Sequence, residues 1–433
     1  MEVTTINFLG IAFIIVMGVL TLILPKRLAL APFIITAFYM TLGQQFVIFS
    51  LNFSIMRLML FFGWLRIILR GEFSAISLNT IDRLIIWWVV ISICTYTLLW
   101  QTQASFINRM GLAYNAIGCY FLFRFLINDI EDITRVVKMT AIIIAPLAIL
   151  ILLEKATGRN LFSIFGGVSE FTLVRDGRLR CQGPFRHPIL AGTVGATLTP
   201  LFIGLWFKET KTKLVSAIGC VSATVLTIAS ASSGPALAYL SGIIGLIMWP
   251  LRKHMRLIRW AILFALISLH ITMKAPVWYL ISRISELIGG SGWHRSYLID
   301  QAISHINEWW LLGTKFTAHW MPYTLTNNPG SADITNQYIY EAVNGGLLTM
   351  ALFIAIIVIC FRDIGRAISS VSDNDPSKIL IWSMGVSLVA HASSFISVTY
   401  FDQMTIFWYL LLAIISSTSI QFNNSQPSPS SQL

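Results

Sequence analysis

The sequence predicts an all-α integral membrane protein that crosses the bilayer about 12–13 times and carries two long loops on its outer side. Of its 433 residues, 56% are hydrophobic and only 11% are charged, whereas a soluble domain carries about 25% charged residues. Repeated apolar runs of about 20 residues are each long enough to cross a hydrocarbon core about 30 Å thick. A β-barrel is disfavoured, because these runs are continuous rather than alternating.

Taken in order, the apolar runs predict membrane helices near residues 6–24, 29–50, 54–70, 84–101, 110–127, 137–154, 188–206, 214–230, 233–250, 259–274, 336–361, 379–396 and 403–420. The chain then divides into N-terminal membrane helices (1–154), a first long loop (155–187), central membrane helices (188–274), a second long loop (275–335), C-terminal membrane helices (336–420) and a tail (421–433). The second long loop is expected to carry amphipathic helices. The tail is rich in Asn, Ser, Pro and Gln, which predicts disorder.

Basic residues of the short loops indicate how the chain is oriented. Nearly all of them fall in alternate loops, whereas the short loops of the opposite side contain only Arg109. Such a bias assigns the basic side to the cytoplasm, the N-terminus to the outside and the C-terminus to the inside. Both long loops then lie outside, so chemistry at the outer face is expected within them. The net charge of +11 is better explained by topology and anionic lipids than by nucleic acid.

The first long loop ends in a cationic segment that leads directly into a membrane helix. Its basic residues are Arg175, Arg178, Arg180, Arg186 and His187. Pro188 follows them at a position suited to the first turn of a helix, where its missing N–H costs nothing. Guanidinium groups at such a place can hold an anion, such as a phosphate, against the membrane surface.

The second long loop contains an amphipathic stretch over residues 293–312. Its apolar face is expected to comprise Ile299, Ile303, Ile306 and Trp310, so that the helix lies along the membrane surface or packs on the bundle. Arg295 lies on the apolar side, where a buried guanidinium needs an anionic partner. That partner is either a ligand or a local acid such as Glu286 or Asp300.

Hydrogen-bonding side chains gather where the second long loop meets the next membrane helix. Asn336, Gln337, Tyr338 and Glu341 could contact sugar hydroxyls there. The alternative is an ordinary interfacial tyrosine together with helix capping by Thr335 or Asn336.

Three motifs, taken together, resemble a known family. They are the run Arg180-Cys-Gln-Gly183-Pro-Phe185-Arg-His187-Pro188, the segment from Arg295 to Trp310-Leu-Leu-Gly313, and Thr335-Asn336 followed by Gly346. Tyr400-Phe-Asp402, before the last helix, is also similar. Over residues 170–415 the order and spacing of these motifs resemble the O-antigen ligase/polymerase superfamily of bacterial envelope glycan enzymes.

The chain departs from that family at three positions. Thr335 stands where the family has a histidine, Asn344 where it has the glutamate of an E-x-G motif, and Lys315 where a second glycine is common. Glu341 lies one turn from Asn344. In the ligases of the superfamily that histidine is implicated in activity, so the resemblance favours a polymerase over a ligase.

The resemblance implies a membrane glycosyltransferase of the bacterial inner membrane with its active site facing the periplasm. The donor would be a glycan on undecaprenyl diphosphate, and the acceptor a glycan or a lipid. Arg180 and Arg295 would clamp the diphosphate, assisted by Arg186 or Arg178. Asn336 and Tyr338 would contact the sugars. No metal or other cofactor is expected, and whether a chain-length regulator also binds is left open.

The general base is not fixed by the sequence. A hydroxyl nucleophile needs a proton acceptor within hydrogen-bond reach. His187 and Glu341 are the first candidates, and His294 and His305 are alternatives.

Two further readings of the sequence are open, namely a ligase that moves a finished glycan from undecaprenyl diphosphate to lipid A-core or another acceptor, and a flippase. A flippase or transporter without chemistry is the main alternative of another class, but such a protein places ionisable groups at mid-membrane depth. Here these groups gather at helix ends and in the outer loops.

Arg57 and Arg66 are either intramembrane site residues or interfacial groups that snorkel to water, and for Arg66 snorkelling is the stronger interpretation. Ser230-Ala-Ser-Ser-Gly-Pro235 is interpreted as a tight turn between two helices.

Overall fold

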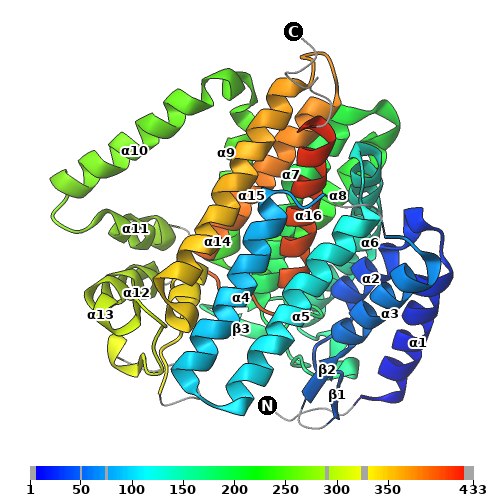
Figure 1. Ribbon diagram of the computed structural model, residues 1–433, viewed down its shortest axis with the longest axis horizontal. Helices are drawn as coiled ribbons and strands as arrows, with labels where there is room; N and C mark the ends of the chain where they lie inside the picture. Colours follow the sequence, from blue (N-terminus) through cyan, green and yellow to red (C-terminus); the bar gives the residue numbers. More distant parts are fainter. Residues whose placement is uncertain (1–5, 49–50, 74–76, 288–291, 323–329, 424–433) are drawn as a thin grey trace.

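The protein is a bundle of long helices with two short β-hairpins (Figure 1). The computed structural model describes residues 6–48, 51–73, 77–287, 292–322 and 330–423. Within these ranges, eight helices are long and apolar enough to cross a membrane. They are α4 (Thr80–Trp100), α6 (Ile130–Thr157), α7 (Pro188–Lys208), α8 (Lys213–Ala229), α10 (Met255–Thr272), α14 (Gln337–Ser370), α15 (Ser377–Phe395) and α16 (Met404–Asn423). The prediction of an all-α, multi-pass membrane protein is therefore confirmed.

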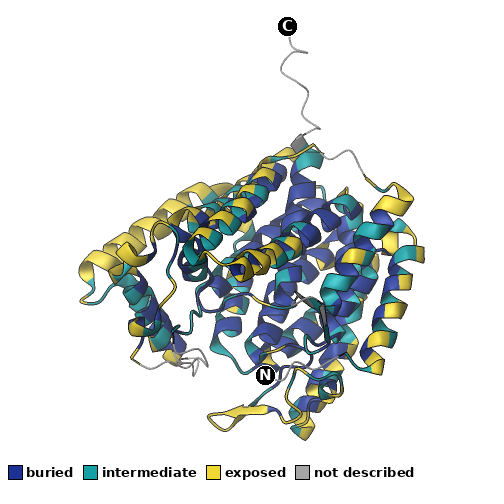
Figure 2. Ribbon diagram, turned by 60° about the horizontal axis from the view of Figure 1, so that its bottom comes forward, coloured by how far each residue is buried: buried dark blue, intermediate teal, exposed yellow. Residues whose placement is uncertain are grey.

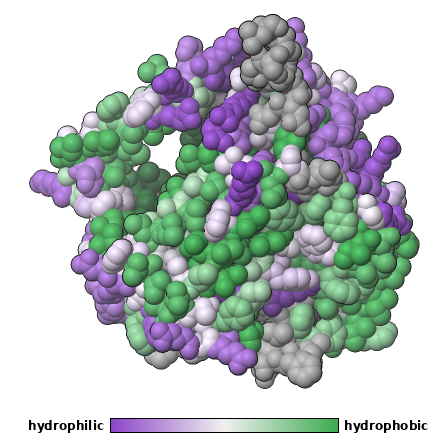
Figure 3. All heavy atoms as spheres, viewed as in Figure 1, coloured by the Kyte–Doolittle hydropathy of each residue, from purple (hydrophilic) through white to green (hydrophobic). Residues whose placement is uncertain are grey.

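The other elements are shorter, or less apolar. The helices among them are α1 (Phe8–Ile23), α2 (Ala31–Tyr39), α3 (Ile55–Arg70), α5 (Gln103–Leu126), α9 (Ser233–Ile247), α11 (Leu280–Leu287), α12 (Gly292–Ser304) and α13 (Ile306–Trp309). The strands are β1 (Gln45–Ile48), β2 (Leu51–Ser54), β3 (Leu173–Arg175) and β4 (Arg178–Arg180). In Figure 3 a broad hydrophobic surface covers the middle of the visible face, while hydrophilic residues gather near the top.

The predicted helix over residues 29–50 is wrong in its second half. Helix α2 ends at Tyr39, and Gln45–Ile48 then pairs antiparallel with Leu51–Ser54. Gly43 explains the change of structure, because it packs against the backbone of the first long loop. A Cβ atom on Gly43 would lie 2.5 Å from the backbone nitrogen of Gly167. The loop between α2 and the hairpin is thus fixed by a tertiary contact that a hydropathy pattern cannot reveal.

Helix α7 lies at the centre of the bundle and is largely buried. It packs on α8 and α15 through small residues, as is usual between membrane helices. A Cβ atom on Gly195 would lie 2.2 Å from the carbonyl oxygen of Ala223 in α8. On the opposite side, the Ser387 hydroxyl of α15 donates a hydrogen bond of 2.7 Å to the carbonyl of Thr197. Close packing here fixes the position of the loop that connects α8 to α9.

Helix α10 stands apart from the bundle (Figures 1 and 2). None of its residues is buried, and its apolar side chains include Phe264 and Ile271, which are 63% and 76% exposed. A helix that is apolar on all sides and uncovered by protein is suited to lie in lipid. It leads into the second long loop, which returns beneath it to α11 and α12.

Of the two positions expected for the apolar face of the second long loop, the described residues favour the membrane surface over packing on the bundle. The helix breaks at His305, between α12 and α13. Ile303, Ile306 and Trp310 are 50%, 42% and 52% exposed, whereas Leu298 is fully buried. The face that packs on the bundle therefore differs from the predicted one. The predicted face lies on the outside, where it is available to a membrane surface.

Two glycines, one in the middle of this loop and one in α14, attach the loop to α14. Gly313 has φ +95° and Gly346 has φ +75°, and a Cβ on either one would lie within 2.2 Å of a backbone oxygen of the opposite segment. The N–H of Thr314 donates to the carbonyl of Val343, at 2.9 Å. Two of the motifs that carry the family resemblance therefore pack directly on each other.

The predicted disordered tail begins too early in the sequence. Gln421 belongs to α16, and its side chain accepts a hydrogen bond of 3.0 Å from the backbone N–H of Ile130. Residues 424–433 lie outside the described part of the chain. Helix α14 likewise continues to Ser370, beyond its predicted end at residue 361.

Candidate functional site

The cationic segment of the first long loop begins as a β-hairpin. Leu173–Arg175 pairs with Arg178–Arg180 across a two-residue Asp176-Gly177 turn. Both turn residues have positive φ, +50° and +70°, which is the conformation that Asp-Gly favours between two strands. Arg178 and Arg175 are exposed on this hairpin, whereas Arg180, at the end of β4, is half-buried.

Buried polar groups hold the chain directly after the hairpin. The Glu154 carboxylate, near the end of α6, accepts hydrogen bonds from the backbone N–H groups of Gln182 and Gly183, at 3.1 and 2.8 Å. The Asn160 amide donates to the carbonyl of Gly183 at 2.7 Å. Gly183 itself has φ +55°, which disfavours other residues. Fixed in this way, the loop holds Arg180 beside the N-terminus of α9.

Arg180 reaches the N-terminus of α9. Its Nη2 donates to the Ser232 hydroxyl at 2.7 Å. Ser232 is the N-cap residue of α9 but makes no side-chain capping bond to that helix, so the positive end of the helix dipole is left without a side-chain cap. The Nε of Arg180 is buried and has no hydrogen-bond partner among the described residues.

Arg295 approaches the same helix end from the second long loop. It lies in α12 and is only 9% exposed. Its Nη1 contacts the hydroxyls of Ser233 and Ser285, at 3.2 and 3.4 Å. The two hydroxyls also contact each other at 3.4 Å. Segments more than 100 residues apart in the sequence therefore meet at one helix terminus.

The local salt bridge that was one explanation for Arg295 does not form. The Glu286 carboxylate accepts from Ser282 instead, at 3.1 Å. The ion pairs of the described residues include neither Arg180 nor Arg295. We call Arg180, Arg295, Ser232 and Ser233 the arginine–serine cluster.

The electrostatics of this cluster reflect crowded positive charge. Burial and the neighbouring Arg175 and Arg180 lower the pKa of Arg295 to about 10. Burial and Arg175 also lower the pKa of Arg180, although Asp176 acts in the opposite direction. Each guanidinium remains charged at neutral pH. Like charges held together with no carboxylate paired to either guanidinium form a site that an anion would stabilise.

His187 lies beside the cluster, and its environment argues against a proton-accepting role at neutral pH. Burial, together with Arg180 and Arg175, lowers the pKa of His187 to about 4. Its Nδ1 accepts a hydrogen bond of 3.1 Å from the N–H of Ile189 and so caps α7. Helix α7 begins at Pro188, as the sequence predicts.

Asp402 is a carboxylate that interacts electrostatically with Arg186 of this segment. It precedes α16 and has φ +60°. Its Oδ2 is buried and lacks a hydrogen-bond partner within the described structure. Burial raises the pKa of Asp402 to about 6, although the neighbouring Arg186 acts in the opposite direction. A carboxylate with a pKa near neutrality is suited to accept a proton.

The predicted sugar-contacting residues are engaged within the protein. Asn336 caps α14 through the N–H of Ile339 and donates to the carbonyl of Ile396, so the capping interpretation holds. The Tyr338 hydroxyl donates to the carbonyl of Ala392 at 3.1 Å. These bonds hold α14 against the end of α15.

Glu341 is also bound internally. It is buried, and its two carboxylate oxygens accept from the Trp88 indole and the Gln337 amide, at 3.1 and 2.7 Å. With both oxygens occupied, Glu341 serves the packing of α14 on α4. Of the two other histidine candidates for the base, His294 contacts the carbonyl of Asp333 and His305 that of Gln301.

Sequence reasoning missed Ser232, Ser233 and Asp402 as members of the site. Ser230–Pro235 was interpreted as a plain turn, and two of its serines meet the arginines. A signal was present, because paired serines and a proline at a helix start form an anion-binding terminus when a cation lies nearby. Asp402 belongs to a family-like motif but carries no local pattern that marks a base.

No family model matches the chain, and a search of curated proteins finds no match either.

Proposed function

We propose that the protein is a membrane glycosyltransferase that polymerises undecaprenyl-diphosphate-linked oligosaccharide repeats of a surface polysaccharide. The arginine–serine cluster carries this proposal. The buried guanidinium of Arg295 and the half-buried guanidinium of Arg180, from two different long loops, converge on one helix N-terminus, where their hydrogen-bond partners are hydroxyls and not carboxylates. An isolated buried charge is costly, so an anionic ligand is the natural partner.

A diphosphate leaving group suits this arrangement. Guanidinium groups donate paired hydrogen bonds to phosphate oxygens, and a helix N-terminus adds a favourable dipole. Both would strengthen as negative charge develops on the diphosphate in the transition state. The exposed Arg178 of the hairpin and Arg186 would assist from the rim.

The proposed transfer is a substitution at the anomeric carbon that requires no metal or other cofactor. A hydroxyl oxygen of the acceptor sugar forms a bond to the anomeric carbon of the donor. The bond from that carbon to the diphosphate oxygen breaks, and the lipid diphosphate leaves with the electron pair. Asp402 is the proton acceptor that we favour, since its unpartnered oxygen and its pKa of about 6 suit a base at neutral pH.

The proposed location is the periplasmic face of the bacterial inner membrane. The distribution of basic residues among short loops supports this orientation. Both long loops meet at one end of α9, so a substrate held by their arginines would lie at a membrane surface. The α10 face that is exposed beside the second long loop would be available to the lipid carrier and other membrane lipids.

The test is an analysis of lipid-linked glycans in a host that lacks the gene. Undecaprenyl carriers and surface glycan are extracted, and their chain lengths are compared by gel and mass spectrometry. Carriers that hold single repeats, with no long glycan, are expected for a polymerase. Long polymer that stays on the carrier would instead indicate a ligase. Intermediates trapped on the cytoplasmic side would indicate a flippase, and either result would overturn the proposal.

Complementation with point variants links the outcome to the cluster. Arg180→Ala should fail to restore long glycan, although the variant reaches the membrane at the wild-type level. Arg283→Ala is the matched control, because Arg283 is an exposed arginine of α11 in the second long loop. Normal chain lengths with Arg180→Ala would rule out the clamp.

A further inference from the structure

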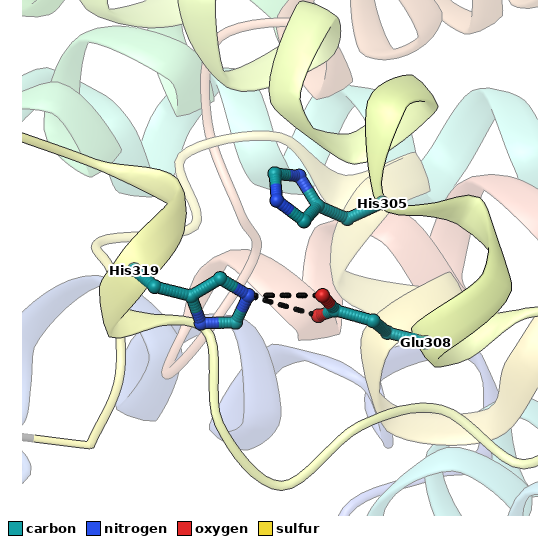
Figure 4. A group of neighbouring side chains, drawn as sticks. All are labelled: His305, Glu308 and His319. Atoms are coloured by element: carbon teal, nitrogen blue, oxygen red, sulfur yellow. Dashed lines mark hydrogen bonds and ion pairs between the residues drawn. The ribbon is translucent and has the colours of Figure 1, made fainter.

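The second long loop carries a group of three side chains with metal-ligating chemistry. His305, Glu308 and His319 bring their ligand atoms within 4.8 Å of one another. Figure 4 shows the three side chains converging, with His319 facing the carboxylate of Glu308. His305 and Glu308 come from the junction of α12 and α13, and His319 from a short 3-10 turn, Ala318–Trp320.

Two of the three side chains, His305 and Glu308, are oriented by further interactions. Nδ1 of His305 contacts the carbonyl of Gln301 at 2.9 Å, so Nδ1 carries the proton and Nε2 has the lone pair of a metal ligand. The Trp320 indole donates to one oxygen of Glu308 at 3.1 Å, which leaves the other oxygen available. The ring of His305 stacks on Trp320, with centroids 5.7 Å apart. Outer hydrogen bonds of this kind are typical around bound metal ions.

The geometry suits a small divalent transition metal. His319 Nε2 lies 3.0 Å from both oxygens of Glu308, and two ligands of a tetrahedral zinc ion lie about 3.3 Å apart. The ligand atom of His305 lies within 4.8 Å of the other two, so it would need to approach them by at most about 1.5 Å. Two imidazoles and one carboxylate suit zinc, whereas Ca²⁺ and Mg²⁺ prefer all-oxygen sites.

The simplest alternative is an ion pair between His319 and Glu308. The Glu308 carboxylate and the His319 ring are 36% and 49% exposed, and exposed pairs contribute little to stability. An ion pair also needs no third residue. It leaves unexplained why a ring nitrogen of His305 lies within 4.8 Å of both partners.

We propose that His305, Glu308 and His319 form a zinc site that fastens the turn Ala318–Trp320 to the start of α13. Zinc would displace the proton that His319 shares with Glu308, and a water molecule or a solute would complete its coordination. Because Gly313 attaches the following residues to α14, the ion would close a loop that is already anchored at its middle. The proposal is independent of the glycan chemistry.

The test is zinc binding by the full-length protein, purified in detergent with a tag that contains no histidine. After chelator treatment, Zn²⁺ is titrated in competition with a chromophoric chelator. One zinc per chain is expected, together with a higher thermal midpoint. His305→Gln, Glu308→Gln and His319→Gln should each weaken zinc affinity at least 10-fold, and the midpoints of these variants should no longer respond to zinc.

The control is His254→Gln, because His254 lies at the end of a 3-10 turn away from this group. This variant should bind zinc as the wild type does. Glu308→Gln can still accept the Trp320 hydrogen bond, so it separates loss of the metal from loss of local structure. Absence of a zinc equivalent in the wild type, or unchanged affinity in a double variant of both histidines, would overturn the proposal. Neither result depends on glycan transfer.

Discussion

Two buried arginine sites in this protein have opposite surroundings. Arg66 of α3 is fully buried, and each of its three guanidinium nitrogens has a partner. Nε and Nη2 bind the two oxygens of Glu72 at 2.8 and 2.7 Å, and Nη1 donates to the carbonyls of Thr21 and Leu24. Arg180 and Arg295 contact only serine hydroxyls by side-chain hydrogen bonds among the described residues.

The difference separates a structural arginine from one suited to a ligand. Arg66 has a local counter-charge, so its burial needs nothing from outside the protein. The snorkelling that the sequence suggested for Arg66 is wrong, because the side chain is 0% exposed. The arginine–serine cluster lacks such a counter-charge. Holding unpaired positive charge away from water costs free energy, and such an arrangement is expected at a functional site.

The largest expected effect on stability comes from breaking the ion pair between Arg66 and Glu72. Glu72→Ala leaves Arg66 buried without its carboxylate, which should lower the free energy of unfolding by about 3–5 kcal/mol. Thermal unfolding of the detergent-purified protein measures the loss. Glu170→Ala is the control, since Glu170 forms an exposed pair with Arg159 and should leave the midpoint unchanged. Equal midpoints for the two variants would contradict the structural role of Arg66.

The opposite pattern is expected at the cluster. Arg295→Ala should reduce product formation by about 10²–10³-fold, the usual cost of removing one donor to developing charge. Its thermal midpoint should stay the same or rise, because a crowded positive charge is removed. Product chain length in the complemented deletion host and thermal unfolding are measured together. A variant that unfolds like Glu72→Ala would show that Arg295 is structural.

If Asp402 is the base, the activity of the protein depends on pH. A base with a pKa of about 6 accepts a proton only when deprotonated, so activity should rise with pH through 6. Asp402→Asn should lower activity by about 10²-fold at pH 8 and remove this acid limb.

The effect of Asp402 on stability has the opposite sign. Burial raises its pKa above the unfolded value, so the folded state binds more protons between about pH 4 and 6, and stability falls as pH rises through that window. Asp402→Asn should therefore raise the thermal midpoint at pH 8. A lower midpoint would contradict the inference that burial destabilises the charged carboxylate of Asp402.

The smallest expected effect on product formation comes from removing a serine hydroxyl of the arginine–serine cluster. Ser233→Ala removes one partner of Arg295, and a hydrogen bond to a charged group contributes about 1.5 kcal/mol, which corresponds to roughly 10-fold in product formation. Rates from initial product accumulation are compared with those of Ser241→Ala, a serine of the same helix that bonds only within α9. Equal rates for both variants would remove Ser233 from the site.

The sequence could not distinguish polar side chains that are fully hydrogen-bonded within the protein from those that are free to bind a ligand. Asn336, Tyr338 and Glu341 looked as suited to a ligand as Arg180 did, but their donors and acceptors are occupied by Ile339, Ala392 and Trp88. Those partners come from other helices or from the helix's own first turn. Only the packed structure decides which polar side chains have unused bonding capacity.

The sequence by itself determined the membrane class and most of the helices, and it singled out Arg180 and Arg295 as candidates. Apolar length and charge position are local properties, and the bilayer acts on each segment separately. Tertiary structure alone decided that residues 45–48 and 51–54 pair as antiparallel strands, that two arginines share the N-terminus of α9, and that Asp402 keeps an unpartnered oxygen. These features depend on contacts between segments far apart in the chain, and such contacts leave no periodic trace in the sequence.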